Sequence, residues 1–172
     1  RLPSILPDLG SEESLEVTRV RSVAGCPQGR PLLTRPSFCA PHHSVNVAGL
    51  IGSIRPFRPG DASLAHRGVL FLDELPEFRR NVLEALQEPL DTGKVMLRHT
   101  HTVITYPAQF QLVASMNPCP CGQFGNGRVG DCACSAGMIQ RYRTRIPKSV
   151  FDSFDLRVRL DSPSGTQPDA PA

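Results

Sequence analysis

The 172-residue sequence lacks any uninterrupted apolar run long enough to span a membrane, and its start does not resemble a signal peptide. We therefore expect a soluble cytoplasmic protein with no membrane partner. The sequence also lacks a strong charge of one sign. Its net charge of +3 permits nucleic acid as a partner without favouring it. It contains no internal repeat, and its length suits one domain with a substantial core.

A further feature that the sequence lacks is a phosphate-binding loop. No Gly-Lys-Ser or Gly-Lys-Thr occurs, and Gly93-Lys94 is followed by Val95. In nucleotide-binding loops of that kind, Gly-rich backbone and a lysine surround the phosphates. This chain therefore does not itself supply those phosphate contacts.

The hydrophobic patterns predict an α/β fold. We expect a helix that begins at Ser11, with that serine as its cap, and ends near Gly25. Residues 26–41 are rich in proline and glycine, so they predict an extended connection. Little apolar content predicts a disordered tail at 162–172 after a folded region at 1–161. The other expected elements are a strand at 68–72, a helix at 81–93, a hairpin at about 94–106, a strand at 110–117, a helix at 136–146 and a strand at 155–161.

Two acids follow directly after the apolar run of the stretch GVLFLDELPEF. In a parallel α/β sheet, the carboxyl ends of the strands face the ligand crevice. Asp73 could there hold a magnesium ion through water, and Glu74 could polarise a water for attack on a phosphoryl group. The alternative, that both acids only begin a solvated loop, stays open.

A polar residue also ends the next predicted strand, in LVASMNPC. The neutral amide of Asn117 could orient water or contact a terminal phosphate without repelling it. In the alternative interpretation, Asn117 only starts a turn with Pro118. Together with the acid pair, the amide favours a nucleotide site.

Four of the six cysteines form two tight pairs, Cys119 with Cys121 and Cys132 with Cys134, which we call the cysteine cluster. In a chain without export signals, this grouping favours metal ligation over disulfides. Four thiolates suit a tetrahedral zinc site, although the spacing is C-x-C rather than the better attested C-x2-C. Four reduced cysteines in a loop remain the alternative. The isolated Cys26 and Cys39 are expected to act as small hydrophobic residues.

Basic residues gather in RYRTR, where Arg141, Arg143 and Arg145 alternate with Tyr142. On a helix they would spread over several faces, which is typical of a solvated surface. The alternative is that they face a groove and, together with Arg98 of the predicted hairpin, contact the phosphates of DNA.

Several motifs occur in an order that resembles a known family. They are FRPGDASLAHRGVLFLDELPEF, EALQEPLDTGKV, FQLVASMNPCPCG and FDSFDLRV. Over roughly residues 1–160 they closely resemble the magnesium-chelatase-like AAA+ ATPases of the ComM/YifB type. APHHS, with His42 and His43, and SLAH, with His66, also match motifs of that family.

The resemblance implies a P-loop NTPase (AAA+) three-layer α/β/α core with a β-hairpin before sensor 1. It implies that LFLDE is the Walker B strand, with Asp73 at Mg-ATP and Glu74 as the catalytic base, and that Asn117 is the sensor-1 residue. Expected cofactors are ATP and Mg²⁺, with zinc as a further candidate. Expected partners are other copies of the chain in a ring, and DNA, because the group is associated with DNA processing.

The sequence departs from the family pattern at several points. The phosphate-binding loop and the C-terminal lid do not occur in it, and Ser153 stands where a trans-acting arginine is expected. Arg157 and Arg159 are expected in a strand that they would have to leave to replace that arginine. We expect either a fragment or a decayed copy. The chain is therefore either a segment of an ATP-driven motor acting on DNA or an inactive scaffold that zinc could stabilise. A chelatase role in tetrapyrrole synthesis is a weaker third option.

Overall fold

A three-stranded parallel sheet forms the centre of the computed structural model, which describes residues 2–26, 32–125 and 132–160. Its strands are β1 (Phe38–Cys39), β4 (Val69–Leu72) and β7 (Gln111–Ala114), in the order β1-β4-β7. Crossovers between parallel strands require intervening chain, which here carries the helices. The predicted α/β class and the strands around 68–72 and 110–117 are thereby confirmed.

The central strand β4 is an apolar run because it is covered on both faces. Val69, Leu70 and Leu72 are fully buried. At the start of this strand the backbone of Gly68 lies so close to Ser37 that any side chain there would collide with the Ser37 carbonyl. Glycine at this position therefore permits β1 and β4 to pair. The core draws its other buried side chains from the surrounding helices and hairpins, including Leu50, Ala65, Val82, Leu83, Leu86, Val95 and Val150.

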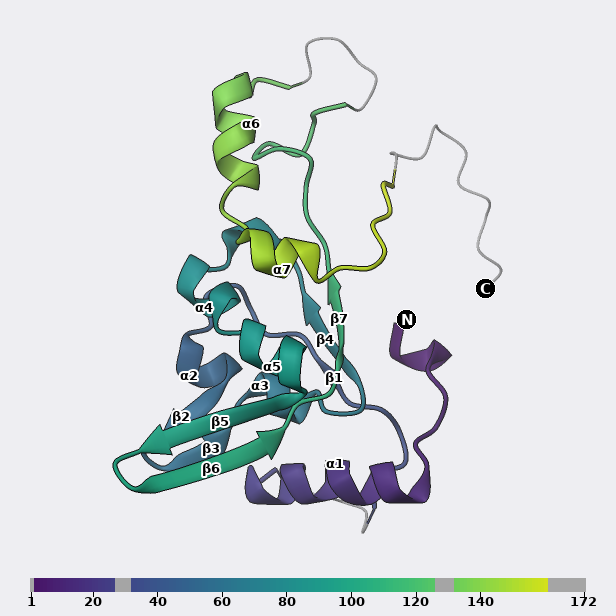
Figure 1. Ribbon diagram of the computed structural model, residues 1–172. Coiled ribbons are helices and arrows are strands. Elements are labelled where there is room, and N and C mark those ends of the chain that lie inside the picture. The colour runs from purple at the N-terminus through teal and green to yellow at the C-terminus, as the bar shows by residue number, and fades with distance from the viewer. Residues whose placement is uncertain (1, 27–31, 126–131, 161–172) are drawn as a thin grey trace.

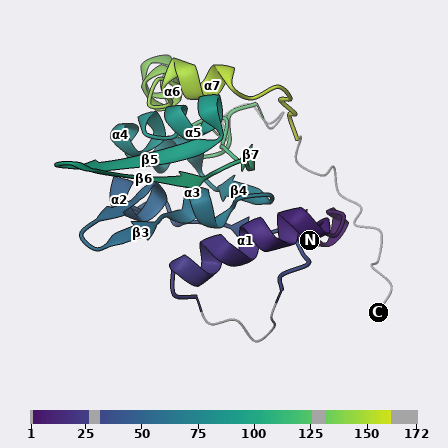
Figure 2. The same ribbon diagram turned by 60° about the horizontal axis from the view of Figure 1, so that its bottom comes forward.

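Two antiparallel hairpins project from the same side of the molecule (Figures 1 and 2). The first joins β2 (Gly52–Ile54) to β3 (Phe57–Pro59), and the second joins β5 (Lys94–His99) to β6 (Thr102–Pro107). In β5 the side chains alternate, with Val95 and Leu97 buried. The hairpin predicted at about 94–106 is confirmed.

The helices surround the sheet at both of its ends. Figure 1 shows α1 near the amino ends of the strands and α6 and α7 beyond their carboxyl ends. Within the described ranges, no helix is long and apolar enough to cross a membrane. The helical elements are η1 (Leu2–Ile5), α1 (Ser11–Val23), α2 (Val47–Leu50), α3 (Asp61–Leu64), η2 (Leu75–Glu77), α4 (Arg80–Glu84), α5 (Gln87–Thr92), α6 (Ala136–Arg143) and α7 (Lys148–Asp152).

Two helix predictions need correction. The cap of α1 is Gly10 rather than Ser11, and the Gly10 N–H donates to the Glu13 carboxylate at 3.0 Å. The single helix expected at 81–93 is two helices, α4 and α5. Pro89 explains the break, because it has no N–H to donate to Ala85 and its ring crowds that carbonyl. The predicted end at Gly93 is confirmed, with φ of 67°.

Two predictions of chain path were also wrong. The segment expected to be only an extended connection at 26–41 contains β1, which pairs with β4. The strand expected at 155–161 is irregular over its described residues, and Leu156 and Val158 are 80% and 69% exposed. Alternating side chains form a strand only where a neighbouring strand accepts its hydrogen bonds, and this segment pairs with no described strand. The tail predicted at 162–172 lies outside the described residues.

A buried histidine joins α1 to the amino ends of β4 and β7. His66 is 2% exposed, and its Nδ1 accepts a hydrogen bond from the Gln109 N–H at 3.1 Å. Its Nε2 therefore carries the hydrogen and donates to Glu16 Oε2 at 3.1 Å. Arg67 Nε donates to the same oxygen at 2.8 Å. Burial lowers the pKa of His66, despite the opposing effect of Glu16, so the ring is neutral in the folded protein.

We expect His66→Ala to lower the free energy of unfolding by about 1–3 kcal/mol, because it removes a buried side chain together with its hydrogen bonds to the Gln109 N–H and to Glu16. Since the unfolded histidine binds a proton more readily than the buried one, the wild-type protein should lose stability as the pH falls below about 6.5. Urea unfolding at several pH values measures both effects.

The matched control is His101→Ala, because His101 is exposed in the turn between β5 and β6. It should change the free energy of unfolding little. Equal losses in the two variants, or a His66→Ala protein with an unchanged acid dependence, would contradict the role given to His66.

Candidate functional site

The register of β4 and β7 brings two polar segments together at the carboxyl edge of the sheet. Leu72 pairs with Ala114, so the residues that follow, Asp73 and Ser115, lie opposite each other. The Ser115 N–H continues the pairing by donating to the Leu72 carbonyl at 3.0 Å. Parallel strands place the residues that follow them at a common edge, and this edge carries the candidate site.

Ser115 contacts both acids, although the sequence analysis did not identify it. Its hydroxyl donates to Asp73 Oδ1 and accepts from the Glu74 N–H at 3.2 Å. Its carbonyl accepts from the Leu75 N–H at 2.9 Å. The signal was present in the sequence, because Ser115 follows its strand as Asp73 follows the partner strand. Both carboxylates remain exposed to solvent.

Glu74 has a left-handed backbone, with φ of 55° and ψ of 51°. This conformation is unfavourable for a residue with a side chain. Hydrogen bonds from the N–H groups of Glu74 and Leu75 to Ser115 hold the turn in place. The turn lies directly after Asp73, at the end of the strand, and backbone strain of this kind is common at functional sites.

Asn117 lies two residues after Ser115 in the sequence, and its side chain is exposed. The Tyr142 hydroxyl of α6 lies near the Asn117 backbone. Burial raises the pKa of Tyr142, and the carboxylates of Glu77 and Glu74 raise it further, against the lowering effect of the Asn117 backbone. The Tyr142 phenol therefore stays neutral. Its hydroxyl lies close enough to the segment after β4 to interact electrostatically with the carboxylates of Glu74 and Glu77.

An ion pair fastens α6 to the segment after Glu74. Arg145 Nη1 lies 3.1 Å from both carboxylate oxygens of Glu77. Arg143 is also engaged, since it donates to the Pro118 carbonyl at 3.4 Å and lies over the Phe124 ring at 5.9 Å. Two of the three arginines in RYRTR therefore have partners within the chain, and Arg141 is exposed as the solvated-surface interpretation expects. Figure 1 places α6 and the β5–β6 hairpin, which carries Arg98, at separate ends of the molecule.

The third strand of the sheet is also followed by polar residues. His42 and His43 come after β1, with ring centroids 4.0 Å apart and ring planes tilted by 36°. The His43 ring meets the edge of Phe78 at 6.5 Å, and His42 Nδ1 lies 2.8 Å from the Ser44 hydroxyl. These histidines thus border the segment after β4, while His66 lies at the opposite end of the strands.

The cysteine cluster lies next to this edge. Its four sulfur atoms lie within 4.8 Å of one another, and all four cysteines are free thiols. Although burial opposes ionisation, hydrogen bonds from Cys121, from the Phe124 backbone and from Cys132 lower the pKa of Cys119 to about 6. The sequence predicted this group of four, and the structure brings its members together.

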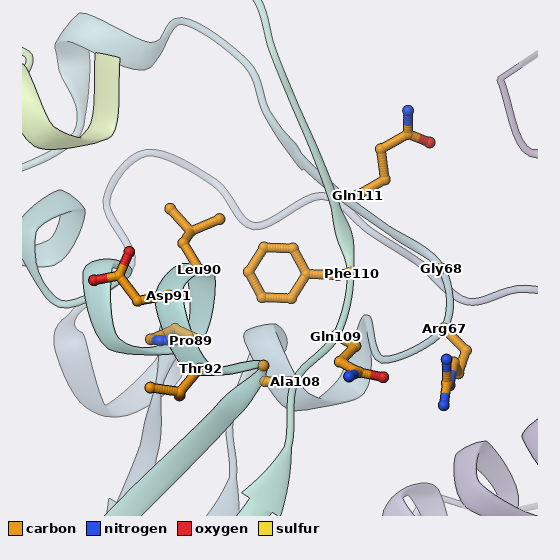
Figure 3. Close-up of a pocket in the computed structure, with 11 residues that line it drawn as sticks. Arg67, Gly68, Pro89, Leu90, Asp91, Thr92, Ala108, Gln109, Phe110 and Gln111 are labelled. Atoms are coloured by element: carbon orange, nitrogen blue, oxygen red, sulfur yellow. The ribbon is translucent and has the colours of Figure 1, made fainter. Parts of the chain in front are cut away.

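A cavity of about 720 Å³ lies elsewhere, between α5 and the start of β7 (Figure 3). Its lining includes Leu90, Phe110 and Arg67. Asp73, Glu74 and Asn117 are not among the lining residues. The candidate site is therefore an exposed edge of the described chain and not this cavity.

Ser153 is the last position that the sequence analysis singled out. It ends α7, and its hydroxyl donates to the Val150 carbonyl at 2.7 Å. Arg157 and Arg159 do not lie in a strand, contrary to expectation. Arg157 donates to the Phe151 carbonyl at 2.9 Å, and Arg159 donates to the Gly125 carbonyl at 3.3 Å.

Comparison with known proteins identifies the family. The family model described as "Magnesium chelatase, subunit ChlI" matches residues 1–167. The chain belongs to this family. Members of the magnesium chelatase ChlI family have the P-loop AAA+ fold, and the α/β structure with its parallel sheet agrees with that fold. The resemblance to magnesium-chelatase-like proteins of the ComM/YifB type is thereby confirmed.

Relatives in this family cover nearly all of the chain. An uncharacterized protein of Mycobacterium tuberculosis (strain H37Rv) is 49% identical over 93% of the chain and 32% of its own length. YifB of Escherichia coli K12 is 42% identical over 95% of the chain and 32% of its own length. Competence protein ComM of Haemophilus influenzae is 39% identical over 93% of the chain and 31% of its own length. The chain thus spans about a third of the length of these relatives.

The left-handed turn at Glu74 yields a stability prediction. Replacing Glu74 by glycine removes a strain of roughly 1–2 kcal/mol and adds about 0.5–1 kcal/mol of unfolded-state entropy. Glu74→Gly should therefore change the free energy of unfolding by about 0–1 kcal/mol in the stabilising direction, as measured by urea unfolding.

Glu84→Gly is the matched control, because Glu84 is an exposed glutamate in α4 with ordinary helical geometry. The Glu84→Gly substitution should lower the free energy of unfolding by about 1 kcal/mol. If both glycine variants lose the same stability, the backbone at Glu74 is not strained.

Proposed function

We propose that this chain is the magnesium- and water-binding segment of an AAA+ ATPase that couples ATP hydrolysis to the remodelling of DNA. The observation that supports it most is the pairing of β4 with β7, which sets Asp73 and Glu74 beside Ser115 and ahead of Asn117 at one strand edge. Membership of the family supports the AAA+ part. The nucleotide and DNA parts are our inference.

The donor set at this edge suits Mg²⁺. Oxygen ligands, and carboxylates above all, are those that Mg²⁺ binds, usually with several waters retained. Asp73 would hold the ion, with its carboxylate oriented by the Ser115 hydroxyl. A bound Mg²⁺ would neutralise charge on the phosphates of ATP. Glu74 is exposed and has a left-handed backbone directly after Asp73. Its carboxylate would accept a proton from the attacking water.

Asn117 would orient that water or contact the terminal phosphate. Its amide carries no charge, so it would not repel the phosphoryl oxygens. The closeness of its backbone to the Tyr142 hydroxyl supports this role, because the buried side chain of Tyr142 packs next to the amide. Tyr142 is a positioning residue in this proposal.

Two partners complete the proposal. The first is further copies of the chain in a ring, since phosphoryl transfer in this fold uses charge supplied from a neighbour. The second is DNA. Its support is the competence protein among the relatives and the exposed basic side chains of Arg98 and Arg141.

The 172-residue chain alone should hydrolyse ATP no faster than background, because nothing in its sequence supplies the loop that holds the phosphates. In a longer family chain that includes such a loop, Glu74→Gln should leave nucleotide affinity nearly unchanged and lower turnover by about 10²–10⁴-fold. Phosphate release and fluorescent-nucleotide titration measure the two quantities.

Glu84→Gln is the control and should keep full turnover, because Glu84 pairs with Arg80 on the surface of α4. Equal turnover in wild type and Glu74→Gln would exclude Glu74 as the base. Absence of turnover in the longer wild-type chain would favour the inactive scaffold.

Ser153→Arg should raise the assembly-dependent ATPase rate of the longer chain, with little change in nucleotide affinity. An arginine contributed to a neighbour's nucleotide accelerates phosphoryl transfer by roughly 10³ to 10⁵-fold in other systems. Serine carries no charge and here bonds only to its own helix end. Rates measured across protein concentrations separate assembly from chemistry.

No rise in a sample shown to form rings would mean that another arginine already acts or that motor function is lost. Arg157→Ala and Arg159→Ala, made separately, distinguish these outcomes. Loss of turnover in either variant would identify the arginine that acts in place of residue 153.

A further inference from the structure

The sulfur atoms of the cysteine cluster have the spacing of a tetrahedral metal site. The separations are 3.4 Å for Cys119 and Cys121, 3.7 Å for Cys119 and Cys132, and 3.7 Å for Cys121 and Cys132. Four thiolates bound to zinc at about 2.3 Å form a tetrahedron with edges of about 3.8 Å. The fourth sulfur, that of Cys134, lies within 4.8 Å of the other three.

The chemistry of these ligands favours zinc over other occupants. The four cysteines contribute sulfur, and soft thiolates select zinc, whereas Mg²⁺ and Ca²⁺ bind oxygen. Two disulfides would need only two close pairs of sulfur atoms, and each pair would approach to about 2.05 Å. Here all four thiols converge on one point instead.

The backbone around the first pair permits this convergence despite the short C-x-C spacing. Gly122 has φ of 78°, and its N–H donates to the Cys119 carbonyl at 3.0 Å. This turn brings the chain back immediately after Cys121. The backbones of Cys121 and Phe124 also lie near the Cys119 sulfur, which is fully buried.

The amino-acid composition between the outer cysteines is poor in apolar residues. Residues 119–134 contain two large apolar side chains, Phe124 and Val129, among four glycines and several polar residues. Phe124 is 44% exposed. A segment of this composition cannot build a hydrophobic core, and a metal commonly provides the missing stability in such cases.

The cluster connects two elements of the candidate site. Cys119 follows Asn117 by two residues, and Gly122 lies beside that side chain, since a Cβ on Gly122 would be 4.0 Å from Asn117 Oδ1. Cys134 directly precedes Ser135, whose hydroxyl caps α6 by accepting from the Met138 N–H at 3.3 Å. The last turn of α6 carries Tyr142, and Arg145 follows it.

We propose that the cysteine cluster binds one structural zinc ion and that this ion fastens the loop after Asn117 to the start of α6. Zinc then holds α6 where Tyr142 lies near the Asn117 backbone and Arg145 pairs with Glu77. The sulfur geometry alone supports the metal site. The effect of zinc on nucleotide chemistry rests on the function proposed above for Asn117.

Metal analysis of the 172-residue chain, purified in reducing buffer, tests the site. We expect about one zinc per chain. Cys121→Ser and Cys132→Ser should each lose most of it to a chromogenic chelator, and Cys132→His should retain more than Cys132→Ser, because histidine is also a zinc ligand. Cobalt substitution should give the absorption bands of tetrahedral tetrathiolate Co²⁺.

Cys26→Ser and Cys39→Ser are the matched controls, because these two cysteines lie outside the cluster. Both should keep their zinc. Absence of metal from folded, reduced protein would overturn the proposal. So would equal zinc loss in the Cys26→Ser control and the cluster variants, or a cobalt spectrum without thiolate bands.

Hydrogen exchange tests the fastening independently of ATP. Chelation of the zinc should speed amide exchange in residues 117–125 and in α6, and added zinc should reverse it. The β5–β6 hairpin is the internal control and should exchange at an unchanged rate. Uniform acceleration over the whole chain, or no change in α6, would remove the proposed link even if zinc binds. Neither readout depends on the proposed ATPase function.

Discussion

The parallel register of β4 and β7 is the constraint on which the candidate site depends. Because Leu72 lies opposite Ala114, the first residues beyond the two strands are Asp73 and Ser115, and they meet. A shift of one residue would turn the buried side chains of β4 outward, so the core enforces the register. The hydrophobic packing of the strands therefore also determines which polar groups face each other at their ends.

Helix α6 joins the features that lie beyond this edge. Its amino end follows Cys134, its middle buries Ile139, and its last turn places Tyr142 beside the Asn117 backbone. Arg145 then reaches Glu77, which lies three residues after Glu74. One short helix thus contacts the chain after β4 and the chain after β7, so its position affects both sides of the candidate site.

Local patterns predicted part of the fold, and they missed the β2–β3 hairpin and the short helices α2, α3 and α7. The strand at 68–72, the hairpin and the helix at 136–146 all appeared where hydrophobic periodicity placed them. The failures have physical causes outside those patterns. The two-residue strand β1 is too short to produce a period, and its existence depends on β4. The alternation at 155–161 gave no strand, because alternation does not supply a neighbouring strand.

The site was predictable to a similar extent. Asp73, Glu74 and the cysteine cluster stand out because their residue types carry specific chemistry. Ser115 did not stand out, because serine is common and its role comes only from the register of the two strands. Tyr142 was likewise invisible as a partner of Asn117, since the sequence separates them by a long loop. Such contacts depend on how segments far apart in the sequence pack together, and local sequence patterns do not predict that packing.

The described sheet ends at β7, which pairs with β4 along one side and with no described strand along the other. Its backbone on that side faces no strand among the described residues, and its four residues, Gln111–Ala114, include no proline or lysine that would discourage pairing. The partly buried side chains of Leu112 and Val113 make this edge apolar as well. Handled as an isolated chain, the protein would therefore be prone to add a foreign strand there, so low concentration and a check for edge-to-edge aggregates should accompany work with it.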